Sequence, residues 1–171
     1  MYLTDLIFNP KLMAEIGKIF ATKFADLDAQ YVITMETKGI PIALMTARAL
    51  NLPLVSIRKA SKVTEGSVVS INYITGSSKK IETMSLSRRA LPEGSKVIII
   101  DDFMKAGGTA KGMLDLMGEF KAEVLDIGVL IKTSTPSQKL VEEYTSLAVL
   151  KKVNEAAEEI IVDPSKWIRN L

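Results

Sequence analysis

The sequence predicts an α/β fold in which a central parallel β-sheet is flanked by helices and carries an inserted antiparallel hairpin. Short apolar runs of strand type alternate with amphipathic helical stripes along most of the chain. Strands separated by helices form parallel sheets that are covered on both faces. Between the second and third core strands, two segments of alternating polarity flank a run of turn residues, which is the pattern of a hairpin. A length of 171 residues suits one domain, so we treat residues 1–171 as a single unit.

The first part of the chain predicts two helices and two strands. Asn9 and Pro10 suit the N-cap and the first position of a helix. Apolar residues at helical spacing then continue that helix: Leu12, Ile16, Ile19, Phe20 and Phe24. The elements that follow are a strand over 31–35, a helix over 40–50 with Pro41 in its first turn, and a strand over 52–58.

The second part of the chain begins with the hairpin and returns to core strands. Turn residues at 75–80 separate the two hairpin segments, and Pro92, Glu93 and Gly94 form a further turn. The apolar tail residue Trp167 fits none of the predicted elements. The predicted elements are hairpin strands over 68–74 and 81–86, a core strand over 97–100, a helix over 109–120, a strand over 124–131, a short helix over 140–144 and a last core strand over 146–153.

Composition excludes several classes of protein. The chain has no cysteine, which excludes disulfides, zinc–thiolate sites and thiol nucleophiles. It also has no histidine, the commonest general base and metal ligand. Its apolar runs are far shorter than a membrane span, and its start does not resemble a signal peptide. We therefore expect a cytoplasmic protein that has no membrane partner.

Charge is distributed unevenly, although the net charge is only +2. Residues 56–96 carry eight basic and three acidic side chains, a balance of +5. Residues 111–163 carry six lysines and ten carboxylates, a balance of −4. The positive segment is typical either of a solvated face or of a site for a polyanion.

The segment "VIIIDDFMKAGGTA", residues 97–110, combines features of a binding site. Asp101 and Asp102 follow an apolar strand, and ligands of open α/β sheets lie outside the carboxyl ends of the strands. Gly107, Gly108 and Thr109 then open a helix, whose free N–H groups suit a phosphate. Carboxylates beside a phosphate cradle make sense as acceptors for neighbouring hydroxyls, so the pattern predicts a phosphorylated sugar. A plain strand end with a helix cap explains either half of the pattern alone, but not their combination.

The same segment, read as "VIIIDDFMKAGGT", resembles the 5-phosphoribosyl-1-pyrophosphate (PRPP) signature of type I phosphoribosyltransferases. The resemblance implies a fold of that family, with a pyrophosphate loop after the first strand at Glu36, Thr37, Lys38 and Gly39, and a mobile loop and hairpin over 59–85. It assigns the ribose and the 5′-phosphate to the following nine residues: Asp101, Asp102, Phe103, Met104, Lys105, Ala106, Gly107, Gly108 and Thr109. Further candidates at the end of the second strand and in the mobile loop are Arg58, Lys59, Lys62, Thr64 and Glu65.

A longer likeness reaches beyond that signature. The stretches "ETKGIPIA", "RKASKVTEGSVVSINYITGSS", "TMSLSRRAL" and "DDFMKAGGTAKGM" are similar to the purine operon repressors of Gram-positive bacteria. In those repressors a phosphoribosyltransferase-like domain follows a winged-helix domain that binds DNA, and no winged helix precedes Tyr2 in this sequence. The likeness implies PRPP as effector, Mg²⁺ carried by its pyrophosphate, guanosine tetraphosphate as a competing ligand, a homodimer, and DNA binding only through the winged helix.

Two functions follow from the same motif. The first is an effector-sensing domain of a repressor of purine biosynthesis genes, which binds PRPP without transferring it. The alternative is a catalytic purine phosphoribosyltransferase of the xanthine or adenine type. A transferase has to position a purine at the anomeric carbon, and Phe103 is the one aromatic residue near the motif. One aromatic residue is weak support for a base pocket, and the resemblance to the repressors over nearly the whole chain favours the sensor. We therefore expect no catalytic residues and no metal ligands supplied by the chain.

Overall fold

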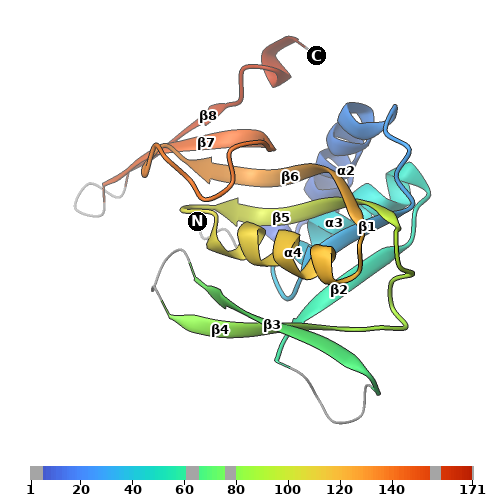
Figure 1. Ribbon diagram of the computed structural model, residues 1–171. Helices are drawn as coiled ribbons and strands as arrows, with labels where there is room; N and C mark the ends of the chain where they lie inside the picture. Colours follow the sequence, from blue (N-terminus) through green and yellow to red (C-terminus); the bar gives the residue numbers. More distant parts are fainter. Residues whose placement is uncertain (1–5, 61–65, 76–79, 155–158, 171) are drawn as a thin grey trace.

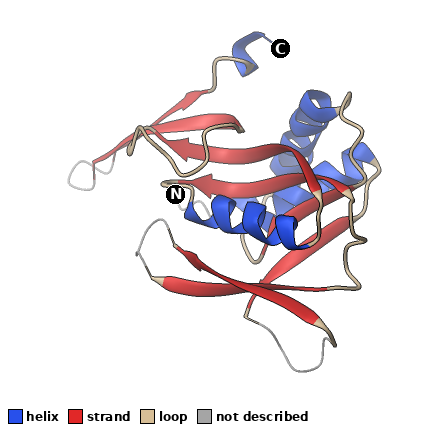
Figure 2. Ribbon diagram, in the orientation of Figure 1, coloured by secondary structure: helices blue, strands red, loops and turns tan. Residues whose placement is uncertain are grey.

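The computed structural model of the chain contains one mixed sheet of eight strands with helices on both faces (Figures 1 and 2). It describes residues 6–60, 66–75, 80–154 and 159–170. The strand order across the sheet is β3-β4-β2-β1-β5-β6-β7-β8. The elements are α2 (Pro10–Phe24), β1 (Tyr31–Met35), α3 (Gly39–Leu50), β2 (Leu54–Lys59), β3 (Val68–Ile74), β4 (Ile81–Ser87), β5 (Lys96–Met104), α4 (Gly108–Glu119), β6 (Glu123–Thr133), β7 (Thr145–Asn154), β8 (Glu159–Pro164) and the 3₁₀ helix η3 (Ile168–Asn170).

The centre of the sheet is parallel and its two borders are antiparallel. Strands β2, β1, β5, β6 and β7 pair in parallel. The hairpin β3–β4 joins the border of β2 through two residue pairs, Arg58 with Ser85 and Lys59 with Met84. At the other border β8 runs antiparallel to β7. The predicted fold class, a parallel sheet with an inserted hairpin, is confirmed.

Strand β5 shows how the two faces of the sheet are covered. Val97 and Ile99 pack into the core beneath α4 and the hairpin, whereas Ile98 and Ile100 pack into the core beneath α2 and α3. All four side chains are fully buried. A strand that is buried on both faces is apolar throughout rather than alternating, which explains the run "VIII" in the sequence.

Helices α2 and α3 pack closely on one face of the sheet. Asn9 caps α2 as predicted, since its side chain accepts hydrogen bonds from the N–H groups of Lys11 and Leu12, both at 3.1 Å. Along α2, a Cβ atom at Gly17 would lie 2.6 Å from the carbonyl carbon of Met45. Glycine is therefore required for the two helices to approach this closely.

Two sequence predictions in the second half of the chain are wrong. No helix forms over residues 140–144, and the chain runs from β6 to β7 through an irregular loop. The spacing of Leu140, Val141 and Tyr144 mimics a helical face, but Leu140 is exposed and its N–H donates to the carbonyl of Ala106, 2.9 Å away. A contact distant in sequence thus replaces the local hydrogen bonds of a helix. In addition, β5 does not end before Asp101 but continues to Met104.

The tail that the sequence left unplaced completes the sheet. It forms β8 and then η3, and between them Trp167 donates its indole N–H to the carbonyl of Ser146 on β7 at 2.8 Å. Within the part of the chain that the structure describes, no helix has the length and the apolar character needed to cross a bilayer.

Candidate functional site

A cavity of about 430 Å³ opens at the carboxyl ends of β1 and β5. These strands are neighbours in the sheet, and the helices that follow them, α3 and α4, cover opposite faces. The two connecting loops therefore diverge and leave a crevice, which is where open α/β sheets bind their ligands. The hairpin closes the third side, because α4 packs against β3 (Figure 1).

The floor of the cavity is the acidic pair of β5. Asp101 is only 7% exposed, while Asp102 is half-buried. The N–H of Asp102 donates to the carboxylate of Asp101 at 2.9 Å, which fixes the orientation of that side chain. Burial first, and the neighbouring charge of Asp102 second, raise the pKa of Asp101 well above its usual range. The pair thus offers one half-buried acceptor, Asp102, and one carboxyl, Asp101, that holds a proton more readily than usual.

The loop after β1 rests directly on this pair. A Cβ atom at Gly39 would lie 3.3 Å from the Asp101 carboxylate and 2.4 Å from the hydroxyl oxygen of Thr34. Glycine at this position therefore lets the backbone pass over the acidic pair. Thr37 and Lys38 beside it are exposed at the rim of the cavity.

Two helix N-termini open into the cavity without side-chain caps. Helix α3 begins after Lys38, and α4 begins after Gly107, and neither residue makes a side-chain hydrogen bond to the helix. Helix α2, which begins away from the cavity, is capped by Asn9. At the start of α4 the first N–H groups lack helical partners and are available to an anion, and the helix dipole favours negative charge there. The start of α3 offers fewer donors, because the N–H of Ile40 donates to the carbonyl of Thr37 at 3.3 Å and Pro41 has no N–H.

The loop before α4 is held from outside the cavity. The ammonium of Lys139 donates to the carbonyl of Lys105, and the N–H of Leu140 donates to the carbonyl of Ala106. Gly107 has a φ of 85°, which favours glycine, and a Cβ atom there would lie 3.3 Å from the backbone nitrogen of Leu140. The loop carbonyls are therefore engaged on the far side.

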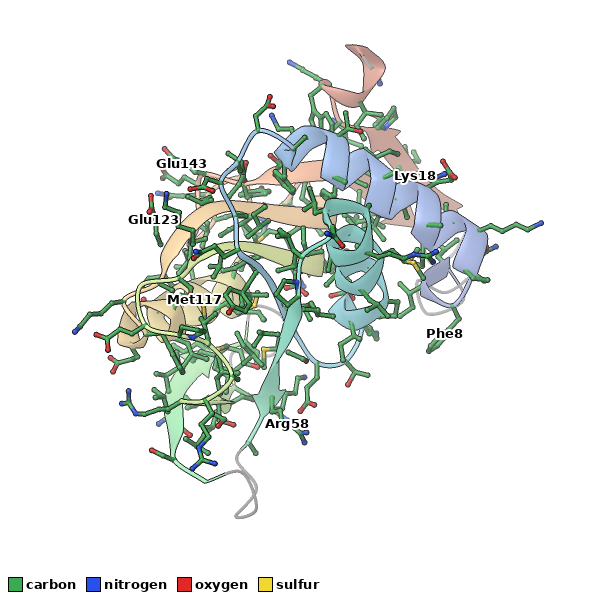
Figure 3. All side chains as sticks on the ribbon, turned by 90° about the vertical axis from the view of Figure 1, so that its right-hand side faces the viewer. Phe8, Lys18, Arg58, Met117, Glu123 and Glu143 are labelled. Carbon is green, nitrogen blue, oxygen red and sulfur yellow. The ribbon has the colours of Figure 1, made fainter. Side chains whose placement is uncertain are left out.

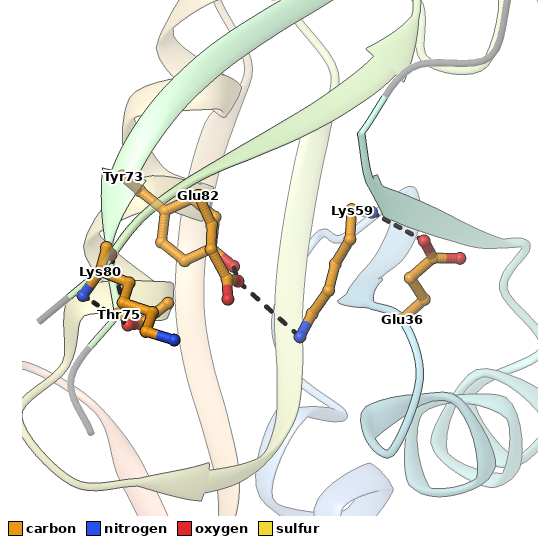
Figure 4. A network of polar contacts seen from close by, with 6 residues as sticks. All are labelled: Glu36, Lys59, Tyr73, Thr75, Lys80 and Glu82. Carbon is orange, nitrogen blue, oxygen red and sulfur yellow. Dashed lines mark hydrogen bonds and ion pairs between the residues drawn. The ribbon is translucent and has the colours of Figure 1, made fainter. Parts of the chain in front are cut away.

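A polar network connects the loop after β1 to the hairpin (Figure 4). The N–H of Lys59 donates to the carboxylate of Glu36 at 2.7 Å. The ammonium of Lys59 lies 3.9 Å from the carboxylate of Glu82, which also accepts the hydroxyl of Tyr73 at 2.8 Å. Burial, followed by this hydrogen bond, raises the pKa of Tyr73. At the end of the hairpin, Thr75 and Lys80 close the strands through backbone and hydroxyl hydrogen bonds.

Most of the residues predicted from sequence line this one cavity. They are Thr37, Lys38, Gly39, Lys59, Asp101, Asp102, Phe103, Met104, Lys105, Ala106, Gly107, Gly108 and Thr109. Arg58 does not line it: this exposed residue lies one position before Lys59 and therefore on the other side of β2 (Figure 3). Lys62, Thr64 and Glu65 lie outside the described residues.

Three lining residues from the hairpin were missed by the sequence analysis: Tyr73, Thr75 and Glu82. A signal for Tyr73 was present, because Val69, Ile71 and Tyr73 alternate along β3 and pack on the α4 side of the sheet. The pairing of β4 with β2 determines which side of the hairpin faces the cavity. The paired residues are distant in sequence, so no local sequence pattern predicts this orientation.

The charge of the lining is nearly balanced. Among the described residues that line the cavity, four are acidic, Glu36, Glu82, Asp101 and Asp102, and three are lysines, Lys38, Lys59 and Lys105. A polyphosphate bound here would need backbone N–H groups and a cation in addition to the lysines. Among the described residues, no group of three or more acidic side chains is placed to hold a metal ion.

Comparison with known proteins gives a consistent family. A family model described as phosphoribosyl transferase domain matches residues 4–166. The chain is 48% identical over 169 residues to the purine biosynthesis transcriptional repressor PurR of Bacillus subtilis, covering 99% of this chain and 59% of that protein. It is 38% identical over 151 residues to a xanthine phosphoribosyltransferase of Lactococcus lactis, covering 85% of this chain and 77% of that enzyme. The chain thus spans about three-fifths of the length of the PurR relative.

Solved structures agree with the fold. The crystal structure of adenine phosphoribosyltransferase from Thermoanaerobacter pseudethanolicus superposes with a TM-score of 0.72 at 21% identity, covering 84% of this chain and 82% of that one. At this level of identity the likeness concerns the arrangement of the sheet and its helices, not the ligand.

Proposed function

Because the chain belongs to the family of phosphoribosyl transferase domains, we propose that it senses PRPP as the effector domain of a regulator of purine biosynthesis genes. The similarity to a PurR repressor over almost the whole chain supports this function. One structural observation carries the ligand assignment: two helix N-termini without side-chain caps and the acidic pair, of which Asp101 is buried, surround the same cavity.

In this proposal each part of PRPP meets a different part of the cavity. The 5′-phosphate lies on the N–H groups at the start of α4, within the loop formed by residues 105–109. The ribose hydroxyls donate to Asp101 and Asp102. The pyrophosphate lies on the start of α3, near Lys38 and Gly39, and within reach of Lys59. The cavity volume of about 430 Å³ falls within the range of small-molecule sites.

The charge balance favours a ligand that brings its own cation. With four acidic side chains against three lysines, the described lining has no excess of positive charge with which to neutralise both a phosphate and a pyrophosphate. We propose that Mg²⁺ enters with the pyrophosphate, which agrees with the preference of Mg²⁺ for phosphate oxygens and water. Guanosine tetraphosphate, which also combines a ribose with phosphates, is the proposed competitor for this cavity.

The alternative function is a catalytic transferase, and the 38% identical xanthine phosphoribosyltransferase is the observation that favours it. The lining favours a sensor instead. Among the described lining residues two are aromatic, Tyr73 and Phe103, and Tyr73 is only 6% exposed, so Phe103 offers the more accessible ring for stacking on a purine. With PRPP, Mg²⁺ and each of adenine, guanine, hypoxanthine and xanthine, we expect no nucleotide above background. Turnover with any one base, followed by liquid chromatography, would establish the transferase.

Partners outside this chain complete the proposal. The part of the PurR relative that the chain does not cover is two-fifths of that protein, which leaves room for a DNA-reading domain. We propose that operator selection is made by a winged helix there, and that the effector domain acts as a homodimer.

Calorimetry with PRPP and Mg²⁺ tests the binding site. The Asp101→Ala/Asp102→Ala variant should lose about 1–3 kcal/mol of binding free energy for each hydroxyl left without its acceptor. A matched control is Glu142→Ala/Glu143→Ala, which removes an adjacent and exposed acidic pair outside the cavity. Equal PRPP affinity in the two variants would overturn the site assignment.

A further inference from the structure

A second hollow, which we call the basic groove, lies between β7, the residues after β8, the end of α2 and the loop after β6. Its volume is about 720 Å³, larger than that of the cavity at β1 and β5. Among the described residues that line it, one is acidic, Asp163. Six are cationic: Lys23, Lys132, Lys139, Lys151, Lys166 and Arg169.

These cations converge from distant parts of the chain. Lys23 belongs to α2, Lys151 to β7, and Arg169 to η3. Lys132 and Lys139 lie on either side of the end of β6. Burial first, and the charge of Lys132 second, lower the pKa of Lys139. A chance excess of lysine on one helix face would come from one element, whereas here the fold gathers like charges that repel one another. Such an arrangement is stabilised by an anion.

The hydroxyl groups of the groove suit phosphate oxygens. Ser137 lines it on the loop after β6, and so does Ser134, whose hydroxyl already donates to the carbonyl of Lys151 at 3.1 Å. Serine hydroxyls and lysine ammonium groups are the side chains that most often contact nucleic-acid backbones. Six cations spread around an open groove exceed what one phosphate needs, so the fitting ligand carries phosphates in a row.

The aromatic rings of the groove discriminate between two kinds of nucleic acid. The ammonium of Lys23 lies 5.7 Å from the ring centre of Trp167, and that of Lys132 lies 5.4 Å from the ring centre of Tyr144. Single-stranded nucleic acids bind by stacking bases on free aromatic faces. In this groove both rings are half-buried and each has a cation over one face, which reduces the aromatic surface that bases can stack on. This favours the phosphate backbone of a duplex.

We propose that the basic groove binds the phosphate backbone of duplex DNA without reading its sequence. This site differs from the PRPP cavity and does not depend on the proposed ligand of that cavity. The effector domain would then add affinity for DNA beside an operator, whatever domain selects the operator itself.

Fluorescence anisotropy with a labelled duplex of about 20 base pairs tests the proposal across about 50–200 mM salt. The variant is Lys151→Ala/Lys166→Ala, two exposed lysines of the groove. Each lost phosphate contact should reduce the slope of log affinity against log salt by about 0.9, so the double variant should reduce it by about 1.8. Lys151→Arg/Lys166→Arg should retain the slope of the unmodified chain.

The control is Lys11→Ala/Lys121→Ala, which removes the same charge from two exposed positions outside the groove. If it reduces the slope as much as the groove variant, binding follows net charge alone and the proposal is overturned. Tighter binding of a single strand of the same length would also overturn it. Unchanged PRPP affinity of the groove variant separates this result from any failure of the PRPP site.

Discussion

The cavity at β1 and β5 and the basic groove at β7 and β8 both suit phosphate ligands, but they are built in opposite ways. In the cavity the key group is buried, since Asp101 is 7% exposed and bonded to the backbone of Asp102. Carboxylates there outnumber lysines by four to three. In the groove cations outnumber acids by six to one, and Lys151, Lys166 and Arg169 are exposed.

The difference concerns selectivity. Exposed lysines attract any row of phosphates, and the attraction weakens as salt rises. A buried carboxyl with a fixed orientation accepts hydrogen bonds only from groups placed opposite it. The cavity is therefore suited to select one small molecule, and the groove to hold many sequences equally. The following changes test this contrast, beginning with the largest expected effect.

Gly39→Ala should damage the cavity most. The added Cβ would lie 2.4 Å from the Thr34 hydroxyl oxygen, so the loop after β1 has to move off the acidic pair. We expect a loss of about 1–3 kcal/mol in the free energy of unfolding and a weaker PRPP affinity by tenfold or more. Urea unfolding and calorimetry measure the two effects. Gly118→Ala in α4, where the added atom meets open space, is the control; it should leave PRPP affinity unchanged and raise the free energy of unfolding by less than about 1 kcal/mol. DNA binding by the groove should persist in both variants.

Asp101→Asn should stabilise the ligand-free protein while it weakens PRPP binding. The pKa of Asp101 is raised on folding, from an ordinary value of 3.8. The folded state therefore retains a proton that the unfolded chain releases, so stability falls as pH rises from about 4 toward the folded pKa. Asparagine removes this loss, and the melting temperature should exceed that of the unmodified chain by several degrees at neutral pH. Thermal melts at several pH values check this. A difference that does not grow between pH 4 and pH 7 would contradict a raised pKa.

Glu82→Gln should tighten PRPP binding. The glutamine carbonyl keeps the hydrogen bond from Tyr73, but the ion pair with Lys59 and the repulsion of a pyrophosphate are removed. Because both side chains of this pair are partly exposed, stability should change by less than about 1 kcal/mol. We expect an affinity gain of about threefold to tenfold, measured by calorimetry at low salt. Glu119→Gln, an exposed carboxylate at the end of α4, is the control. A lower affinity in Glu82→Gln would mean that Glu82 contacts the ligand favourably.

Trp167→Phe should have the smallest effect and should be confined to the groove side. The ring remains beneath Lys23, but the carbonyl of Ser146 loses its indole donor. We expect a loss of about 1 kcal/mol in the free energy of unfolding, with PRPP affinity unchanged. Chemical denaturation measures it, and Phe8→Leu at an exposed position serves as the reference. A loss of PRPP binding would show that Trp167 contributes to the PRPP cavity.

Elements with a local cause could be predicted from the sequence. Strands β1 and β3 begin and end at the predicted residues, and Asn9 caps α2, because burial pattern and cap chemistry act within a few residues. The motif placed the acidic pair beside the start of α4 for the same reason. The end of β5 was misjudged because apolar character stops at Ile100, where the strand leaves the core and borders the cavity.

Features with a distant cause could not be predicted. Residues 140–144 carry a helical spacing, but the backbone at Leu140 is bonded to Ala106. The basic groove is the clearest case. Residues 111–163 have a negative balance by count, yet the fold draws Lys132, Lys139 and Lys151 from that segment to the side of Lys23 and Arg169. The net charge of a sequence segment therefore does not determine the charge of the surface to which its residues contribute.

Lys139 lines the groove and also contacts the loop that borders the cavity, and this contact couples the two regions thermodynamically. It lines the groove, and its ammonium holds the carbonyls of Lys105 and Pro136 and the hydroxyl of Thr133. A duplex that draws this ammonium toward a phosphate releases the loop in which the 5′-phosphate of PRPP would lie. By reciprocity, bound PRPP must then lower the affinity for the duplex by the same factor by which the bound duplex lowers the affinity for PRPP. In this account a single lysine couples the occupancy of the proposed duplex site to that of the proposed PRPP site, and no domain has to move between them.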